Sequence, residues 1–388
     1  MTFVMRQALE ITWQNLKSIP ARIGTSMVAV VGVAGVVAVL VAVLSMARGF
    51  ESTLQSNTAP DNVIVLRSGS SSELDSGFGG DQTRLIAQAS QLERASAELF
   101  VITDLRKKAT DTDANVPFRG VGEDGPGIRK RFEIIEGRMF EPGRKELIAG
   151  VGAADQFFGL EVGNTLEFGT ERWDVVGLFE TGGAADSELW TAAPVLQGAY
   201  RRGNSFSVVY GKLASADDFQ AFKDDLTTNP QLSVRVDREA DYFAEQSQAL
   251  STFIEGVGYG IAILMALGAL FGALNTMYTA VSDRAREIAT LRAIGFQPGA
   301  VVFSVMAEAM LLALIGGVIG AGAAWLLFNG FTVSTLSFSS FSQVVFAFAV
   351  TPELMVQGLV IAMIIGLVGG LAPALRAART PIVAGLRD

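Results

Sequence analysis

The sequence predicts a membrane protein with four transmembrane α-helices and a large α+β extracytoplasmic domain inserted between helices 1 and 2. Half of the 388 residues are hydrophobic and only 18% are charged, which is too apolar for an ordinary soluble chain. Four apolar runs each approach or exceed the roughly 20 residues that a helix needs to cross a bilayer. The long segment between the first two runs alternates strand and helix patterns and contains most of the acidic residues.

The expected transmembrane helices are residues 23–47, 253–278, 300–328 and 353–373. The first holds no charged residue and is much longer than the apolar part of a signal peptide, so we expect it to remain in the protein as a membrane helix. The fourth follows Thr351, a suitable N-cap, and Pro352, which suits the first helical position.

Basic residues predict how the chain is oriented. They precede the first span, lie between the second and third, and follow the fourth: Arg6, Lys17, Arg22, Arg284, Arg286, Arg292, Arg376, Arg379 and Arg387. By the positive-inside rule, both termini and residues 279–299 are expected in the cytoplasm, in an inner-membrane protein. Residues 1–22 have the pattern of an amphipathic helix on the cytoplasmic membrane surface, and residues 374–388 form a cytoplasmic tail. The loop 329–352 contains no lysine or arginine and is expected on the periplasmic or extracellular side.

The insert, residues 48–252, is expected to be an α+β domain. An α/β unit built from both of its ends is interrupted by a β-rich subdomain at about 116–200, where segments such as "ELIAG" and "RWDVVGLFE" have strand patterns. The glycine- and serine-rich "GSSSELDSGFGG" predicts a mobile loop, and "DQTRLIAQASQLERA" after it has helical periodicity. The helical pattern "EADYFAEQSQALSTF" runs directly into the second span.

The residue types present exclude several kinds of function. There is no cysteine or histidine, which rules out a thiol nucleophile, a zinc site with the usual ligands and a Ser-His-Asp triad. No phosphate-binding loop of the Gly-x-x-x-x-Gly-Lys-Ser/Thr type occurs. The acidic residues of the insert are expected on a solvated surface. We therefore expect no catalytic residue, no metal site, no directly bound cofactor and no nucleic-acid partner.

Glycines spaced four residues apart recur in the spans and predict close helix packing, within a bundle or a dimer. These are Gly256, Gly260, Gly268, Gly272, Gly316, Gly320, Gly366 and Gly370. Glu308 is the one acidic residue well inside a span. It is either a proton-relay carboxylate or a group that reaches water or a loop arginine, and its position about two turns from the cytoplasmic end favours the second reading.

The stretch "SDRAREIATLRAIGF", residues 282–296, predicts a short two-faced helix between the second and third spans. Ser282 is a candidate N-cap, Gly295 a left-handed stop, and Pro298 the start of the next helix. A rigid, capped helix suits docking into a groove of another protein. A simple anchor on the lipid surface would explain the arginines but not the stops.

Two membrane segments carry a distinctive pattern: "TAVSDRAREIATLRAIGFQPGAVVFSVMAEAMLLALIGGVIG" and the C-terminal "GLVGGLAPALRAARTPIVAGLRD". They resemble the FtsX-like membrane domain in permease subunits of ABC transporters of the MacB/FtsX/LolC type. "NVIVLRSG", "IIEGRMFEPG" and "ELIAGVGAADQFFGLEVGNTLEFGTERWDVVGLFE" resemble, more loosely, the MacB-like periplasmic core domain. The chain differs from MacB itself in having no fused ATPase domain, so the resemblance implies that a separate polypeptide supplies it.

The resemblance implies that residues 283–294 are a coupling helix seated in a cleft of that ATPase subunit, which would bind the ATP and magnesium. The implied contact residues are Asp283, Arg284, Arg286, Glu287, Ile288, Leu291, Arg292 and Gly295. It further implies a dimer with a second permease copy or a homologue. ATP-driven closure of the ATPases would move the periplasmic domains for export or extraction of a substrate, a process called mechanotransmission.

Several functions remain open from the sequence. An exporter with a periplasmic adaptor and an outer-membrane channel is one. An FtsX-like transmitter that regulates a cell-wall hydrolase, LolC-like lipoprotein release, and a receptor without an ATPase are the alternatives. No residue pattern indicates the substrate.

Overall fold

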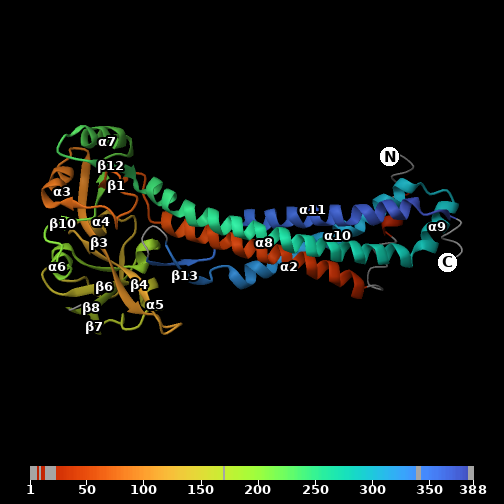
Figure 1. Cartoon of the computed structure of the whole chain (residues 1–388), viewed down its shortest axis with the longest axis horizontal. Coiled ribbons are helices and arrows are strands. Elements are labelled where there is room, and N and C mark those ends of the chain that lie inside the picture. The colour runs from red at the N-terminus through yellow and green to blue at the C-terminus, as the bar shows by residue number, and fades with distance from the viewer. Residues whose placement is uncertain (1–6, 8–9, 14–22, 169–170, 338–341, 383–388) are drawn as a thin grey trace. The chain divides into compact units, whose positions relative to one another are not determined.

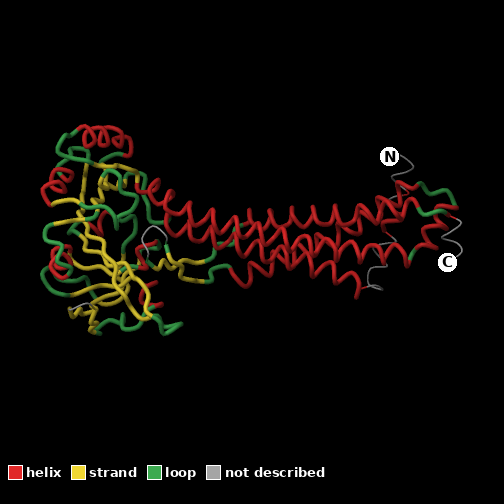
Figure 2. Tube along the Cα trace, in the orientation of Figure 1, coloured by secondary structure: helices red, strands yellow, loops and turns green. Residues whose placement is uncertain are grey.

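The computed structural model describes residues 7, 10–13, 23–168, 171–337 and 342–382. The chain divides into two compact units. The helical unit comprises Met1–Arg48, Phe253–Phe331 and Phe348–Asp388, and the α+β domain comprises Gly49–Thr252 and Thr332–Ala347. Figure 1 labels the elements, and Figure 2 shows that long helices make up the first unit while the strands belong to the second.

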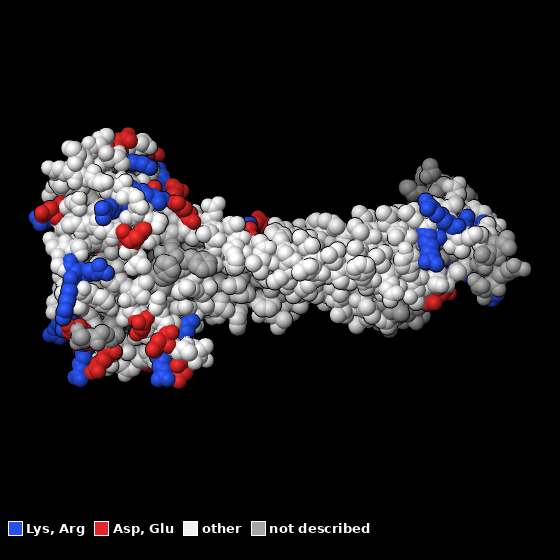
Figure 3. Space-filling model, viewed as in Figure 1, with Lys and Arg blue, Asp and Glu red and all other residues white. Residues whose placement is uncertain are grey.

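Among the described residues, four helices are long and apolar enough to cross a membrane. They are α2 (Ile23–Gln55), α8 (Glu239–Asp283), α10 (Pro298–Phe328) and α11 (Pro352–Arg379). On the face seen in Figure 3, the surface of these helices between the ends of the unit is almost free of charged side chains. The Thr351 hydroxyl accepts a hydrogen bond from the Leu354 N–H at 3.4 Å, which confirms the predicted cap of α11. Of the predicted N-terminal helix, residue 7 and residues 10–13 are helical, and the remainder lies outside the described residues.

Three of the four long helices pack closely through small residues. Valines and leucines of α2 form a buried cluster with alanines of α10 and α11. A Cβ atom built on Gly316 would lie only 2.8 Å from the Val30 carbonyl oxygen of α2, and one built on Gly320 would collide with the Ala34 carbonyl oxygen. Likewise, a Cβ on Gly366 of α11 would lie 2.5 Å from Ala313 Cβ, and one on Gly370 would lie 2.7 Å from Ala309 Cβ. These four glycines therefore allow the α2–α10 and α10–α11 contacts.

The remaining four glycines of the predicted set lie on α8 and have no such neighbours. No atom lies within 4 Å of a Cβ built on Gly256, Gly260, Gly268 or Gly272. Apolar side chains of the same helix, such as Leu264 and Phe271, are 72% and 70% exposed. Within this chain, α8 therefore turns its glycine-rich surface outward.

A single sheet organises the α+β domain. Its strand order is β12-β1-β11-β3-β4-β9-β6-β8-β5, with β7 paired to β8. The strands are β1 (Asn62–Arg67), β3 (Leu92–Arg106), β4 (Asp113–Val121), β5 (Glu133–Gly137), β6 (Glu146–Gly150), β7 (Thr165–Phe168), β8 (Glu171–Glu180), β9 (Leu189–Ala192), β11 (Val208–Leu213) and β12 (Val234–Arg238). A small separate pair joins β2 (Phe78–Gly79) to β10 (Ser205–Phe206). Most pairs are antiparallel, whereas β4–β9 and β6–β8 are parallel.

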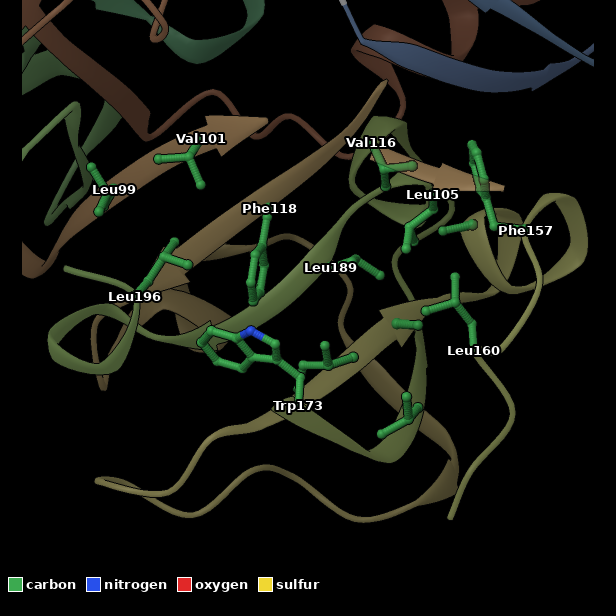
Figure 4. Packing of buried hydrophobic residues seen from close by; sticks show 14 residues of the cluster. Leu99, Val101, Leu105, Val116, Phe118, Phe157, Leu160, Trp173, Leu189 and Leu196 are labelled. Atoms are coloured by element: carbon green, nitrogen blue, oxygen red, sulfur yellow. The ribbon is translucent and has the colours of Figure 1, made fainter. Parts of the chain in front are cut away.

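Short helices complete the domain: α3 (Gly80–Ala87), α4 (Gly125–Ile128), α5 (Val151–Gln156), α6 (Ala193–Ala199), α7 (Phe219–Thr228), η2 (Ala184–Ser187) and η3 (Ala216–Asp218). The predicted helix "DQTRLIAQASQLERA" is only half right, because α3 ends at Ala87 and β3 begins at Leu92. The long strand β3 contributes to two hydrophobic cores. One lies under α3 and α7, and the other is built around Phe118 and Trp173, whose rings meet edge to face at 4.9 Å. Figure 4 shows Leu189 and Leu196 beside this aromatic pair.

The loop predicted at residues 329–352 contains a β-hairpin instead. Strands β13 (Thr332–Leu336) and β14 (Gln343–Ala347) pair antiparallel and belong to the α+β domain. The Lys107 ammonium donates to Gln343 Oε1 at 2.9 Å, and the Val345 N–H donates to Ser187 Oγ at 2.8 Å. The chain between α10 and α11 is therefore a second, separate segment from which the domain is built.

The glycine- and serine-rich segment predicted as a mobile loop is packed against the domain. The Asp75 carboxylate accepts hydrogen bonds from the backbone N–H groups of Ser71 and Ser72, and these bonds hold the pKa of Asp75 below its usual value. Glu73 between them is only 5% exposed. The prediction was wrong because a composition rich in glycine and serine indicates a turn, but it does not indicate what the turn packs against.

Gly320→Ala should destabilise the helical unit, because its Cβ would meet the backbone of α2 rather than a movable side chain. Overpacking of this kind costs about 1–3 kcal/mol. We expect the thermal unfolding midpoint of the detergent-solubilised protein to fall by several degrees. Gly322→Ala is the matched control, since no atom lies within 4 Å of a Cβ there. Equal midpoints for the two variants would contradict the α2–α10 packing.

Candidate functional site

The predicted two-faced helix is α9, Ala285–Ala293. It begins after Arg284, whose backbone (φ −110°, ψ 12°) interrupts the long helix α8. Ser282 still belongs to α8, so its predicted role as the N-cap was wrong. At the other end Gly295 has φ +106°, and the Phe296 N–H donates to the Leu291 carbonyl at 3.1 Å. This left-handed stop and the start of α10 at Pro298 are as predicted.

The apolar face of α9 is turned into the helical unit. Ile288 is 8% exposed and packs in one cluster with Met277, Val301 and Ala377, which belong to α8, α10 and α11. Leu291 packs against Ala300 and the described residue Ile11. Ile288 was predicted to contact another protein, and that contact stays a prediction; within this chain its side chain packs against other helices and stabilises the position of α9.

The charged residues of α9 divide into two groups. Asp283, Arg286, Glu287 and Gly295 are exposed. Arg284 and Arg292 instead hold α9 in place. Arg284 Nε lies 3.0 Å from Glu287 Oε2, and the Arg292 guanidinium donates to the Thr380 carbonyl after α11. Of the residues predicted to contact a partner, these four exposed ones are therefore the most accessible.

Glu308 of α10 is one of the groups that position α9. It is 3% exposed, and its Oε2 lies 3.6 Å from Arg284 Nη1. The prediction that this carboxylate reaches a loop arginine is confirmed. Because a charged group inside a span is expensive unless it is paired, this contact ties the start of α9 to α10.

A second constellation lies in the α+β domain and was not predicted. Two arginines and four glutamates are buried together, each no more than 9% exposed. We call this set the charged cluster: Glu73, Glu98, Arg119, Arg129, Glu188 and Glu239.

Arg119 of β4 is the centre of the charged cluster. Its Nε and Nη2 donate to both carboxylate oxygens of Glu188, at 2.7 and 2.8 Å. Its Nη1 lies 2.7 Å from Glu73 Oε2 and 3.1 Å from Glu98 Oε2. Arg129 donates to the same Glu98 oxygen at 2.8 Å, and its guanidinium lies 4.0 Å from the Tyr210 ring centroid. These bonds connect β3, β4 and the residue preceding β9 with the loop before β2.

The charged cluster also holds the first turn of α8. Glu239, the first residue of that helix, accepts a hydrogen bond of 2.7 Å from the Asn62 side chain of β1. Tyr242, one turn later, packs with Ile64 and Tyr210 on the sheet. Because α8 is a single helix of 45 residues ending at Asp283, the helix that begins in the charged cluster ends next to α9.

The charged cluster has more negative than positive groups, since four carboxylates face two guanidinium groups. Burial raises the pKa of Glu73, and it raises the pKa of Glu239 from its usual 4.5 to about 6. Within the described part of the chain, no group of three or more acidic residues has the geometry to hold a metal ion.

Sequence reasoning missed the charged cluster because its members lie far apart in the chain, and the acidic residues were expected in solvent. The available signal was Arg119 within "VPFRGV", an arginine close to Val116, Phe118 and Val121, which are residue types that a buried strand favours. For these four glutamates the expectation of a solvated surface was wrong.

Comparison with known proteins assigns this membrane protein to a class, the membrane permeases with a large extracytoplasmic domain. Residues 26–229 match the MacB-like periplasmic core domain, and residues 259–382 match the FtsX-like permease C-terminal domain. The chain belongs to the family of ABC transporter permeases that combine these two domains.

The relatives include combined ATP-binding/permease proteins and proteins described as permeases alone. The chain is 24% identical to the macrolide export ATP-binding/permease protein MacB of Bdellovibrio bacteriovorus over 97% of its own length and 60% of that protein. It is 22% identical to MacB of Vibrio parahaemolyticus, over 92% and 56%. Thus the chain spans less than two thirds of these relatives. The uncharacterized ABC transporter permease YknZ of Bacillus subtilis is 23% identical over 96% of this chain and 97% of its own length.

Two solved structures resemble part of the chain. One is the periplasmic region of MacB from Actinobacillus actinomycetemcomitans, with a TM-score of 0.38 and 10% identity over 47% of this chain and 91% of that one. The other is the extracellular domain of YknZ, with a TM-score of 0.36 and 16% identity over 45% and 99%.

Glu239→Gln should make the protein more stable at neutral pH. A folded-state pKa raised to about 6 means that the stability contributed by the protonated form is complete below pH 4.5 and is lost as the pH rises through 6. Glutamine keeps the acceptor for Asn62 and remains neutral, so the gain should reach about 2 kcal/mol at pH 7–8 and vanish at pH 4.

Thermal unfolding of the full chain in detergent, followed by tryptophan fluorescence at several pH values, measures this difference. Asp241→Asn is the control, since Asp241 is exposed on the same turn. A constant offset between Glu239→Gln and the original protein at all pH values would contradict the assignment.

Proposed function

We propose that this chain is the permease subunit of an ABC transporter that couples ATP hydrolysis by a separate ATPase subunit to movement of the α+β domain, for export or extraction of a substrate. The observation that carries this proposal is α9, a short helix held at both ends that exposes Arg286 and Glu287 while its apolar face is buried. ATP and magnesium would be bound by the partner ATPase.

A coupling element must transmit force without deforming, and the contacts of α9 suit this role. Its inner face is packed on three helices, and Arg284 and Arg292 connect it to α10 and to the end of α11. The exposed Arg286 and Glu287 leave charged groups of both signs for a partner. Charged groups of this kind give an interface its specificity and register more than its affinity.

Helix α8 provides the route from α9 to the α+β domain. It is continuous over Glu239–Asp283. In its most apolar stretch, 22% of the residues are buried within the chain, compared with 39–50% of the residues in the corresponding stretches of α2, α10 and α11. A continuous helix that is held firmly at its first turn is suited to shift as a rod.

The proposed assembly contains two permease copies in the inner membrane, with both termini cytoplasmic, and two cytoplasmic ATPases. The outward glycines of α8 support close contact with a second copy, because small residues let membrane helices approach. A periplasmic adaptor and an outer-membrane channel are the further partners that export across two membranes would require.

Arg286→Glu and Glu287→Arg should each weaken association with the ATPase at least about tenfold, since either change opposes the charge pattern of α9. The tagged protein is purified from its own cells in mild detergent. The ATPase is identified in the eluate by its phosphate-binding loop peptides and vanadate-sensitive ATP hydrolysis. Arg379→Glu, an equal charge change at the exposed end of α11, is the control. The docking proposal fails if both α9 variants copurify with the ATPase as well as the control does.

Ala249→Pro in α8 should separate ATP hydrolysis from domain movement. Proline removes a helical hydrogen bond and kinks the helix, and residue 249 is exposed, so packing is spared. Because the chain has no cysteine, Glu136→Cys provides a unique spin label in the domain. In the two-copy complex, the distance between labels should change on addition of ATP and vanadate in the Ala249→Ser control but not in Ala249→Pro. An identical change in both variants would rule out α8 as the route.

A further inference from the structure

We propose that a pocket between the ends of α8, α9 and α11 binds the phosphate headgroup of an anionic phospholipid. The pocket has a volume of about 430 Å³. Its polar lining includes Tyr278 and Ser282 of α8, Arg376 of α11 and Thr380, and alanines of α9 form part of its wall.

The pocket offers hydrogen-bond donors and a positive charge without a competing acid. No aspartate or glutamate lines it. The exposed Arg376 guanidinium lies 5.4 Å from the Tyr278 ring centroid, and within the described residues it forms no ion pair, in contrast to Arg284. The hydroxyls of Tyr278 and Ser282 also make no hydrogen bond to described residues, which leaves them available to phosphate oxygens.

A lipid fits better than a free phosphate because the pocket adjoins an apolar contact between α8 and α11. Gly369 of α11 faces α8, where a Cβ on it would lie 3.2 Å from Ala273 Cβ, and Arg376 lies two turns further along the same helix face. On α8, Phe271 lies seven residues before the pocket residue Tyr278, on the same helix face, and its side chain is 70% exposed. This leaves an apolar surface for an acyl chain while the phosphate reaches Arg376.

The position is also that of a membrane interface. Tyrosine and arginine are the side chains that anchor helices at headgroup level, and basic pockets at the cytoplasmic ends of spans bind anionic headgroups. A lipid held there would bridge α11 to α9, because α9 forms part of the pocket wall. The proposal goes beyond the coupling function, since it concerns lipid binding by the permease alone.

The test is native mass spectrometry of the delipidated full chain titrated with dioleoyl phosphatidylglycerol or dioleoyl phosphatidylcholine. The original protein should prefer phosphatidylglycerol, and Arg376→Gln should lower its affinity for that lipid about tenfold. Arg379→Gln, which removes an equal charge outside the pocket, should leave the affinity within about twofold. An unchanged thermal midpoint shows that each variant is folded.

A second pair of variants does not depend on Arg376. Ser282 is exposed, so Ser282→Asp should repel the phosphate while Ser282→Asn, of the same shape, should not. The proposal is wrong if Arg376→Gln and Arg379→Gln, or the two Ser282 variants, lose the same affinity for phosphatidylglycerol. The lipid would then bind to a diffuse basic surface and not to the pocket. Displacement of phosphatidylglycerol by millimolar inorganic phosphate would assign the site to free phosphate. Loss of ATPase copurification in Arg376→Gln with unchanged lipid binding would make it a protein contact.

Discussion

The buried ion pairs of Arg119 are the interaction on which the arrangement of the α+β domain depends. Taking charges out of water is costly, and such a group is kept only when its geometry satisfies nearly every partner. Arg119 meets carboxylates from three separated parts of the chain, and the same cluster includes Glu239 at the start of α8. The first turn of α8 therefore packs against β1 and β11, which are the second and third strands from the β12 edge of the sheet.

The far end of α8 is organised by a related constraint, with fewer charges. Arg284 stands where α8 gives way to α9, and its pairing with Glu308 fixes that corner to α10. Between the two ends, close packing through glycine joins α2, α10 and α11, and α8 meets the same core through Gly258, which faces Val43 of α2, and through the buried Ala262. Even so, α8 has the smallest share of buried residues in its most apolar stretch among the four long helices.

Local patterns sufficed to predict some parts of this protein but not others. The spans, the strands "ELIAG" and "RWDVVGLFE", and the stop at Gly295 follow from hydropathy, alternation and backbone chemistry within a few residues. The hairpin between α10 and α11 and the packed loop around Glu73 depend on partners more than a hundred residues away. The ion pairs of the charged cluster join residues 21 to 69 positions apart, which a local sequence pattern also cannot reveal. Leu92 and its neighbours have a helical pattern, yet pairing with β11 makes them a strand.

The case of Ile288 shows why an amphipathic pattern alone does not define a docking surface in a membrane protein. An apolar face can be satisfied by a partner protein, by lipid or by other helices of the same chain, and the sequence pattern is the same in each case. Here the chain itself covers that face, so hydrophobic burial stabilises the position of α9 and is no longer available for binding. The charged side chains of Arg286 and Glu287 stay exposed, and they are the groups that the proposed partner would recognise. An interface of this kind depends on the alignment of charged groups, and that alignment is maintained because the apolar face is fixed.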